Sequence, residues 1–107
     1  SLSPASPDTM PDGSAAIEAL TVVSVAGDSA GQTNVYVNPA KGGSNKYFYK
    51  TGEAPLAYPG YGEVISQTTW DGEAAITATT GNQIMIIETD SAGKALKAGV
   101  ATVTSKA

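Results

Sequence analysis

A regular alternation between short strand-like runs and turn residues, beginning at residue 17, constrains the fold more than any other feature of this sequence. The runs are rich in Val, Ile, Thr and Tyr, and clusters of Gly, Asn, Asp and Pro separate them at spacings of roughly 8 to 12 residues. No segment shows the apolar spacing that an amphipathic helix requires. The sequence therefore predicts an all-β fold, a sandwich of about seven or eight short strands.

Residues 1–16 differ in composition from the rest of the chain. Pro4, Pro7 and Pro11, together with several Ser and Ala residues, leave this segment without apolar periodicity. We interpret it as an extended arm or linker. Residues 17–107 are enough for one domain and too few for two independent hydrophobic cores.

Alternating apolar residues predict which side chains are buried. In the first run, residues 17–25, Leu20 and Val22 fall on one face and Val23 and Val25 on the other. In the run at residues 46–50, Tyr47 and Tyr49 share a face and Phe48 takes the opposite one. These patterns predict strands that each turn one face toward a core.

Ile84-Met85-Ile86-Ile87 is the only continuous aliphatic run in the chain. Such a run predicts a central strand that is covered on both faces, or on one face and an end. Residues 38–45 predict a loop, and residues 51–62 predict the longest connection and the least core-like part of the domain.

The C-terminal half contains two further predicted connections and three further predicted strands. Asp71-Gly72 predicts the turn of a hairpin between strands at residues 63–70 and 74–79. Residues 88–94 predict a polar hairpin connection, and residues 100–104 predict a closing strand.

The charged residues exclude several classes of function. Ten acidic residues and six lysines, with no arginine or histidine, give a net charge of −4. Nucleic acid is therefore not an expected partner, because little is present to bind phosphate. The chain also has no cysteine, and no apolar run predicts a membrane span or a signal peptide.

Few residues of this chain could act as catalytic groups. Without histidine or cysteine, the remaining general acid–base candidates are carboxylates such as Glu63, Asp71 and Glu73. We interpret these three as turn residues. The sequence predicts no enzyme, no cofactor and no metal site, although residues 88–93 contain two acidic side chains that leave a weak cation site as an alternative.

A spontaneous isopeptide crosslink is a second alternative. Some β-sandwich adhesin domains join a lysine to an asparagine beside a buried carboxylate. Lys46 or Lys50 with Asn82 and Glu88 are the candidates in this chain.

All of the tyrosines and the tryptophan lie between residues 36 and 70. Aromatic side chains can form platforms on which sugars or bases stack. We expect Tyr47, Tyr49 and Trp70 to pack in the core, and we leave exposure and partner contact equally open for Tyr58 and Tyr61, which lie in a Pro/Gly-rich loop.

The body of the chain, residues 20–106, resembles immunoglobulin-like modules of tailed-phage structural proteins, including head-decoration and head-fibre proteins. Fibronectin type III and bacterial immunoglobulin-like repeats look similar as well. The stretches that carry the resemblance are LTVVSVAG from Leu20, KYFYKTG from Lys46, WDG from Trp70, ITATTGN from Ile76 and KAGVATV from Lys97.

The resemblance implies an immunoglobulin-like or fibronectin III-like sandwich that decorates a phage capsid on the exterior of the virion. Its expected partners are the major capsid protein or another virion protein, with a homo-oligomer or a cell-surface glycan as further options. The alternative function is a carbohydrate-binding or adhesin-type module of a larger surface protein, located extracellularly. The residues expected to contact the partner are Leu2, Pro4, Pro7, Met10, Pro11, Tyr58 and Tyr61.

Overall fold

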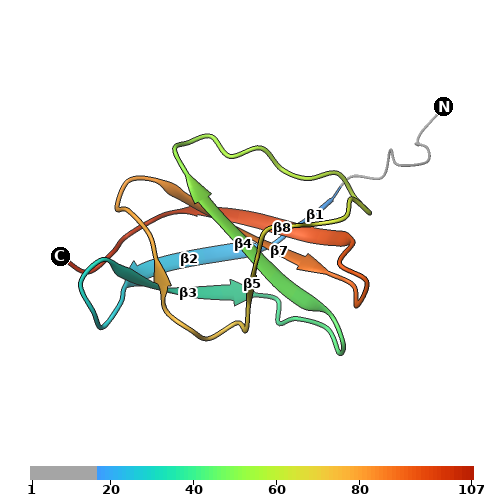
Figure 1. The fold of residues 1–107 in the computed structure, drawn as a ribbon, viewed down its shortest axis with the longest axis horizontal. Coiled ribbons are helices and arrows are strands. Elements are labelled where there is room, and N and C mark those ends of the chain that lie inside the picture. The colour runs from blue at the N-terminus through green and yellow to red at the C-terminus, as the bar shows by residue number, and fades with distance from the viewer. Residues whose placement is uncertain (1–16) are drawn as a thin grey trace.

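The computed structural model describes residues 17–107, which contain eight strands and no helix (Figure 1). No helix in this part of the chain could cross a membrane. The all-β prediction is confirmed. The strands are β1 (Glu18–Ala19), β2 (Thr21–Ala26), β3 (Gln32–Asn38), β4 (Lys46–Gly52), β5 (Thr68–Trp70), β6 (Ile76–Thr77), β7 (Gln83–Thr89) and β8 (Ala95–Thr102).

The strands form two sheets. A five-stranded sheet has the order β1-β8-β7-β4-β5, and a three-stranded sheet has the order β2-β3-β6. Pairing is antiparallel throughout except that β1 runs parallel to β8. This arrangement is consistent with an immunoglobulin-like sandwich, and it places β7 at the centre of the larger sheet, as its aliphatic run predicts.

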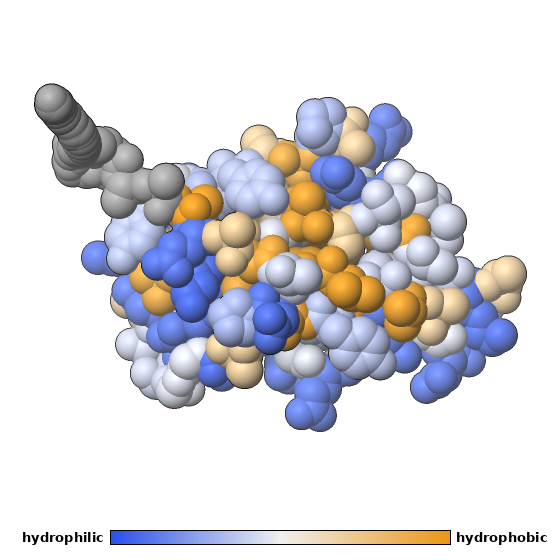
Figure 2. Space-filling view, turned by 180° about the vertical axis from the view of Figure 1, so that it is seen from behind, coloured by the Kyte–Doolittle hydropathy of each residue, from blue (hydrophilic) through white to orange (hydrophobic). Residues whose placement is uncertain are grey.

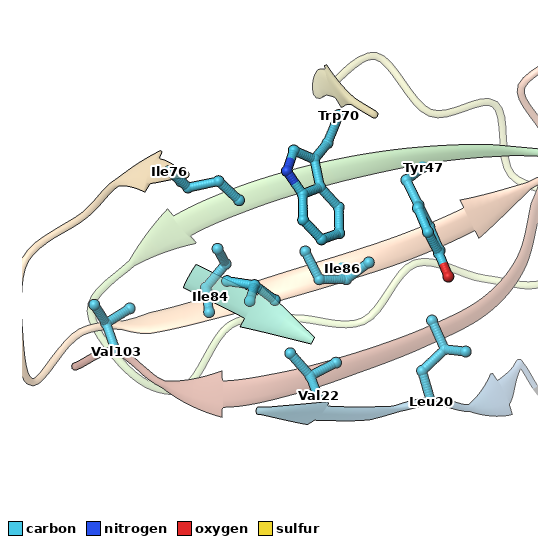
Figure 3. Packing of buried hydrophobic residues seen from close by; sticks show 9 residues of the cluster. Leu20, Val22, Tyr47, Trp70, Ile76, Ile84, Ile86 and Val103 are labelled. Carbon is cyan, nitrogen blue, oxygen red and sulfur yellow. The ribbon is translucent and has the colours of Figure 1, made fainter. Parts of the chain in front are cut away.

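The main core lies between the two sheets (Figure 3). Leu20 and Val22 from the start of the chain meet Ile84 and Ile86 of β7, and Tyr47 of β4 packs with them. Period-2 alternation predicts these inward positions, and it also predicts the exposure of Val23 and Val25. The other buried members of this cluster are Val35, Trp70, Ile76 and Val103.

A second cluster covers the opposite face of the five-stranded sheet. Phe48, Met85 and Ile87 project to this side, where Leu56 and Ile65 of the long loop between β4 and β5 pack against them. Residues 53–67 make up this segment, which we call the tyrosine loop. No side chain of residues 51–62 is fully buried, which agrees with the expectation that this range is the least core-like part of the domain. Leu56 is half-buried, and the buried Ile65 lies beyond that range.

The first predicted strand is divided in two at Leu20. Residues 18–19 pair with β8, whereas residues 21–26 pair with β3 in the other sheet. Between them, the Leu20 amide donates to the Ala98 carbonyl oxygen at 2.9 Å. The chain can approach β8 this closely because residue 99 is glycine, and a Cβ there would collide with the Leu20 carbonyl group.

The predicted hairpin around Asp71-Gly72 is wrong. Trp70 ends β5 in the five-stranded sheet and Ile76 begins β6 in the three-stranded sheet, so residues 71–75 cross from one sheet to the other. Strand structure at residues 63–70 is also confined to the last three residues, because residues 63–65 are bonded to the β7–β8 turn and the start of β8 instead.

The boundaries of the last hairpin differ from the prediction as well. Glu88 and Thr89 belong to β7 and are buried, so the polar connection begins only at Asp90. β8 begins at Ala95, five residues before the predicted closing strand, and pairs with β7 along most of its length. The Gly93 turn and the β-bulge next to Glu88 set this register.

Candidate binding surface

The tyrosine loop presents three large side chains to solvent. Tyr58 is 50% exposed, Tyr61 is 43% exposed and Val64 is 67% exposed. The structure therefore places both predicted loop tyrosines where a partner can reach them. The predicted contact residues Leu2, Pro4, Pro7, Met10 and Pro11 lie outside the described residues.

Hydrogen bonds fasten the tyrosine loop to the sheet on both sides of its tyrosines. Before Tyr58, the Leu56 amide donates to Gln83 Oε1 at 3.0 Å, and Lys50 Nζ donates to the Ala57 carbonyl oxygen at 2.9 Å. After Tyr61, the Gly62 amide donates to the Ala95 carbonyl oxygen at 2.7 Å.

A second group of bonds continues along the same segment. The Ala95 amide donates to the Glu63 carbonyl oxygen at 2.8 Å, and the Ile65 amide donates to the Gly93 carbonyl oxygen at 2.9 Å. With Leu56 and Ile65 held in the second cluster, the loop backbone is fixed at both ends. Exposed tyrosines on such a segment lose little conformational freedom when they bind.

Charged groups near the tyrosines are engaged with the backbone. Glu63 Oε1 accepts a hydrogen bond from the Gly60 amide at 2.9 Å, and Lys50 Nζ bonds to Ala57. The surface offers aromatic rings and hydroxyl groups, which can contact a polar, uncharged ligand.

The loop lies close to the point where the described chain begins. Glu18 pairs with Lys97 of β8, and Ile17 packs against the second cluster that the loop covers. Figure 1 shows the long connection running over the sandwich toward β1.

The remaining aromatic residues are divided between core and surface. Tyr47 and Trp70 are buried with their ring centres 5.5 Å apart, and Tyr49 is partly buried against the same cluster, as expected. Trp70 Nε1 donates to the Ala74 carbonyl oxygen at 2.8 Å, so the only indole is used in the fold. Tyr36, on the outer face of the three-stranded sheet, is 60% exposed.

A shallow hollow of about 460 Å³ lies where the chain crosses between the sheets, lined in part by Tyr49, Trp70 and Asp71. Asp71 Oδ1 accepts hydrogen bonds from the amides of Glu73 and Ala74 at 2.8 and 2.7 Å. These bonds hold the pKa of Asp71 below its usual value, which opposes a role as a proton donor. The interpretation of Asp71 as a turn residue fits this geometry.

Glu88 is the one buried carboxylate of the described chain, at 1% exposure. Its Oε2 accepts hydrogen bonds from Asn45 Nδ2 at 2.8 Å and from the Gly42 amide at 3.0 Å. Its Oε1 has no hydrogen-bond partner within residues 17–107. Burial, and next the negative charge of Glu88, raise the pKa of Tyr47, while a hydrogen bond from the Lys41 backbone opposes the rise.

The candidate isopeptide set does not come together. Asn82 directly precedes β7, and Glu88 lies near the other end of that strand. The two residues are six positions apart, which is roughly 20 Å along extended backbone. Lys50 bonds to the tyrosine loop, and Lys46 is exposed. The side-chain amide that contacts Glu88 belongs to Asn45.

The alternative cation site at residues 88–93 is not assembled either. Asp90 Oδ1 accepts hydrogen bonds from the backbone amides of Lys94 and Ala92, and these bonds close the turn. The same bonds lower the pKa of Asp90. Glu88 points elsewhere, toward Asn45. Among residues 17–107, no three acidic side chains gather closely enough to hold a metal ion.

The sequence suggests a buried Glu88 only in the isopeptide alternative, and it does not predict the bond to Asn45. Continuing the alternation of Ile84 and Ile86 by one step places residue 88 on the same inward face. The polar composition of residues 88–94, which favours a turn, masks this signal.

The sequence matches the model of a known protein family. Residues 25–106 match the model of the S-layer protein SbsC C-terminal domain. No curated protein and no solved structure matches the chain. The match gives no support to a phage origin, and it is consistent with a surface-associated domain of immunoglobulin-like type. Because the model covers most of the sequence, the chain belongs to the family of the S-layer protein SbsC C-terminal domain.

Proposed function

We propose that this domain is a non-enzymatic adhesion module of a larger protein at the cell surface, and that its tyrosine loop binds a neutral polysaccharide. The observation that carries the proposal is the pair of exposed tyrosines, Tyr58 and Tyr61, on a loop that is bonded to the sheet on both sides of them. The family supports a surface location and a structural role.

The chemistry of the loop favours carbohydrate. Tyrosine rings stack on the C–H faces of sugar rings, and their hydroxyl groups bond to sugar hydroxyls. The net charge of −4 disfavours anionic polymers. Because the loop is fixed before binding, little ordering cost opposes a contact that only two rings supply.

A glycan array probed with the full chain and two variants tests the proposal. Tyr58→Ala combined with Tyr61→Ala removes both rings, and Tyr36→Ala is the matched control because it removes an exposed tyrosine from the other sheet. We expect saturable binding to neutral glycans that falls at least about tenfold in the double variant, a loss of about 1.4 kcal/mol, and is unchanged in the control.

Capsid decoration, the function first predicted from the sequence, is tested with the same samples by co-sedimentation with undecorated phage capsids. Saturable capsid binding without any glycan binding would overturn the proposal in favour of decoration. Equal glycan binding by the double variant and the wild type would also overturn it, since the ligand would then bind elsewhere.

A further inference from the structure

The end of β7 carries a carboxylate inside the sandwich with one oxygen unsatisfied. Glu88 is 1% exposed, and its Oε1 has no hydrogen-bond partner within residues 17–107. Hydrophilic side chains belong at the surface, and on the face that Figure 2 shows they surround a middle of apolar ones. A buried acceptor without a partner is rare and costs free energy, so this oxygen needs a physical explanation.

A carboxamide and an amine flank this carboxylate. Asn45 Nδ2 donates to Glu88 Oε2 at 2.8 Å, which holds the carboxamide against the acid. On the other side, Lys97 of β8 is the cross-strand partner of Glu88. Residues directly opposite in an antiparallel pair share a face of the sheet and have Cβ atoms about 5 Å apart. The side chain of Lys97 therefore starts beside that of Glu88.

The alternation along β8 puts Lys97 on the inner face of the sheet. A Cβ at Gly99 would meet the Leu20 carbonyl group, and Ala101 packs against the main core, so residues 97, 99 and 101 face the other sheet. Lys97 is only partly exposed. Rotation of its flexible side chain can bring Nζ past the carboxylate toward the carboxamide of Asn45.

We propose that Lys97 and Asn45 form an isopeptide crosslink, and that Glu88 carries the protons of the reaction. Lys97 Nζ attacks Asn45 Cγ, a bond forms between these two atoms, and the bond between Cγ and Nδ2 breaks. Two protons leave the Lys97 ammonium group in turn. Glu88 accepts each of them and passes it to Nδ2, which departs as ammonium. One amide replaces another, so the reaction needs no oxidant, reductant or co-reactant.

The placement of the three groups favours this reaction. The hydrogen bond to Glu88 fixes the carboxamide before attack, which removes much of the entropic cost of bringing the reacting groups together. Entry of the Lys97 amine also gives Glu88 Oε1 the donor that it lacks. Burial of the carboxylate keeps water away from the reacting carbon.

Glu18 is the competing partner for the Lys97 amine. It lies opposite Lys97 in the parallel pairing of β1 with β8, and it is exposed. An exposed ion pair contributes little free energy, so it does not prevent the amine from entering the sandwich. Lys46 is adjacent to Asn45 but exposed, and Lys50 bonds to the tyrosine loop, which leaves Lys97 as the lysine on the inner face beside Glu88.

The crosslink would tie the loop between β3 and β4 to β8. The segment that it closes, residues 46–96, contains β4 to β7 and the tyrosine loop. A covalent tie across a long segment stabilises a fold by restricting the unfolded chain, and this chain has no cysteine for a disulfide. None of the three reacting residues belongs to the tyrosine loop, so the crosslink and the proposed polysaccharide binding can each fail without the other.

Intact-mass spectrometry of the folded full chain tests the proposal. We expect the protein to be lighter than its sequence by one molecule of ammonia, and its digest to contain a branched peptide that joins residues 45 and 97. Lys97→Arg should keep the full sequence mass, because a guanidinium group stays protonated and does not attack. Lys46→Arg, at the exposed lysine beside Asn45, is the matched control and should lose ammonia as the wild type does.

Two further measurements separate the crosslink from folding. Glu88→Gln, which cannot carry the protons, should react at least about a hundredfold more slowly than the wild type. After one protease cut in the tyrosine loop, denaturing electrophoresis should show joined fragments for the wild type and separate fragments for Lys97→Arg, in which the bond from Asn45 to Glu88 can still form. A wild type of full sequence mass, or ammonia loss that persists in Lys97→Arg, would each overturn the proposal.

Discussion

Asn45 and Glu88, 43 residues apart in the sequence, are joined by a hydrogen bond of 2.8 Å from the asparagine amide to the buried carboxylate. The loop between β3 and β4 thereby closes one end of the sandwich over the last inward position of β7. The bond satisfies a carboxylate oxygen that water cannot reach, so the loop conformation and the buried charge depend on each other.

A double-mutant cycle measures this dependence. Asn45→Ala should reduce the free energy of unfolding by about 1–3 kcal/mol, because Glu88 Oε2 then keeps only the Gly42 amide. In a Glu88→Met background the same substitution should cost far less, since no buried carboxylate needs the amide. Urea denaturation of the four proteins gives the coupling energy, and equal costs in both backgrounds would contradict this account.

Tyr47 gives the protein an alkaline dependence. Its pKa in the folded state is raised above the ordinary value of 10.0, by burial first and by Glu88 second. The stabilisation from keeping the phenol neutral is therefore complete below the unfolded pKa, declines once the unfolded chain ionises, and is lost as the pH rises through the folded pKa.

Tyr47→Phe should flatten the fall in melting temperature between neutral pH and alkaline pH. Tyr36→Phe, at an exposed position, is the matched control and should keep the wild-type slope. Parallel alkaline curves for wild type and Tyr47→Phe would show that Tyr47 does not cause the dependence.

The crossing of the chain between the sheets at Leu20 depends on Gly99. A Cβ at residue 99 would meet the carbonyl group of Leu20, which is backbone and cannot rotate away. We expect Gly99→Ala to destabilise the fold by about 1–3 kcal/mol, as overpacking does. Gly43→Ala, where nothing lies within 4 Å of the added Cβ, should have little effect in the same thermal melts.

Ile65 stabilises the fold and also holds the tyrosine loop against the sheet. Truncation of this buried side chain in Ile65→Ala should cost about 2–4 kcal/mol and loosen the tyrosine loop, which would then be cleaved faster by protease. Val64→Ala, one residue away at an exposed site, should stay within about 0.5 kcal/mol of the wild type. Equal protease resistance in both variants would argue that the hydrogen bonds alone hold the loop.

Period-2 alternation identifies the buried face where a strand covers the core on one side, as for Leu20 and Val22. The continuous aliphatic run of β7 instead identifies a strand that is buried on both faces. Alternation does not show which of the two sheets a strand joins. Nothing local distinguishes a turn that closes a hairpin from one that crosses between sheets, so the sequence predicts a hairpin after Trp70 where the chain crosses to the other sheet.

The candidate surface was only partly predictable for a related reason. The Pro/Gly-rich composition of the tyrosine loop indicates an irregular segment, and it leaves the exposure of Tyr58 and Tyr61 open. What fixes that exposure is long-range: Leu56 and Ile65 pack under the loop, and the backbone of β8 bonds to it. Such contacts join residues far apart in the chain and leave no periodic signal.

The central claim, that the tyrosine loop is the binding surface, is tested most directly by following backbone amide chemical shifts while a neutral oligosaccharide selected on the array is added. The account predicts saturable shifts in residues 56–64 and at their bonded neighbours in β8, with the amides of β2 and β3 unmoved. Shifts centred on β2 and β3, or none at saturating ligand, would contradict it.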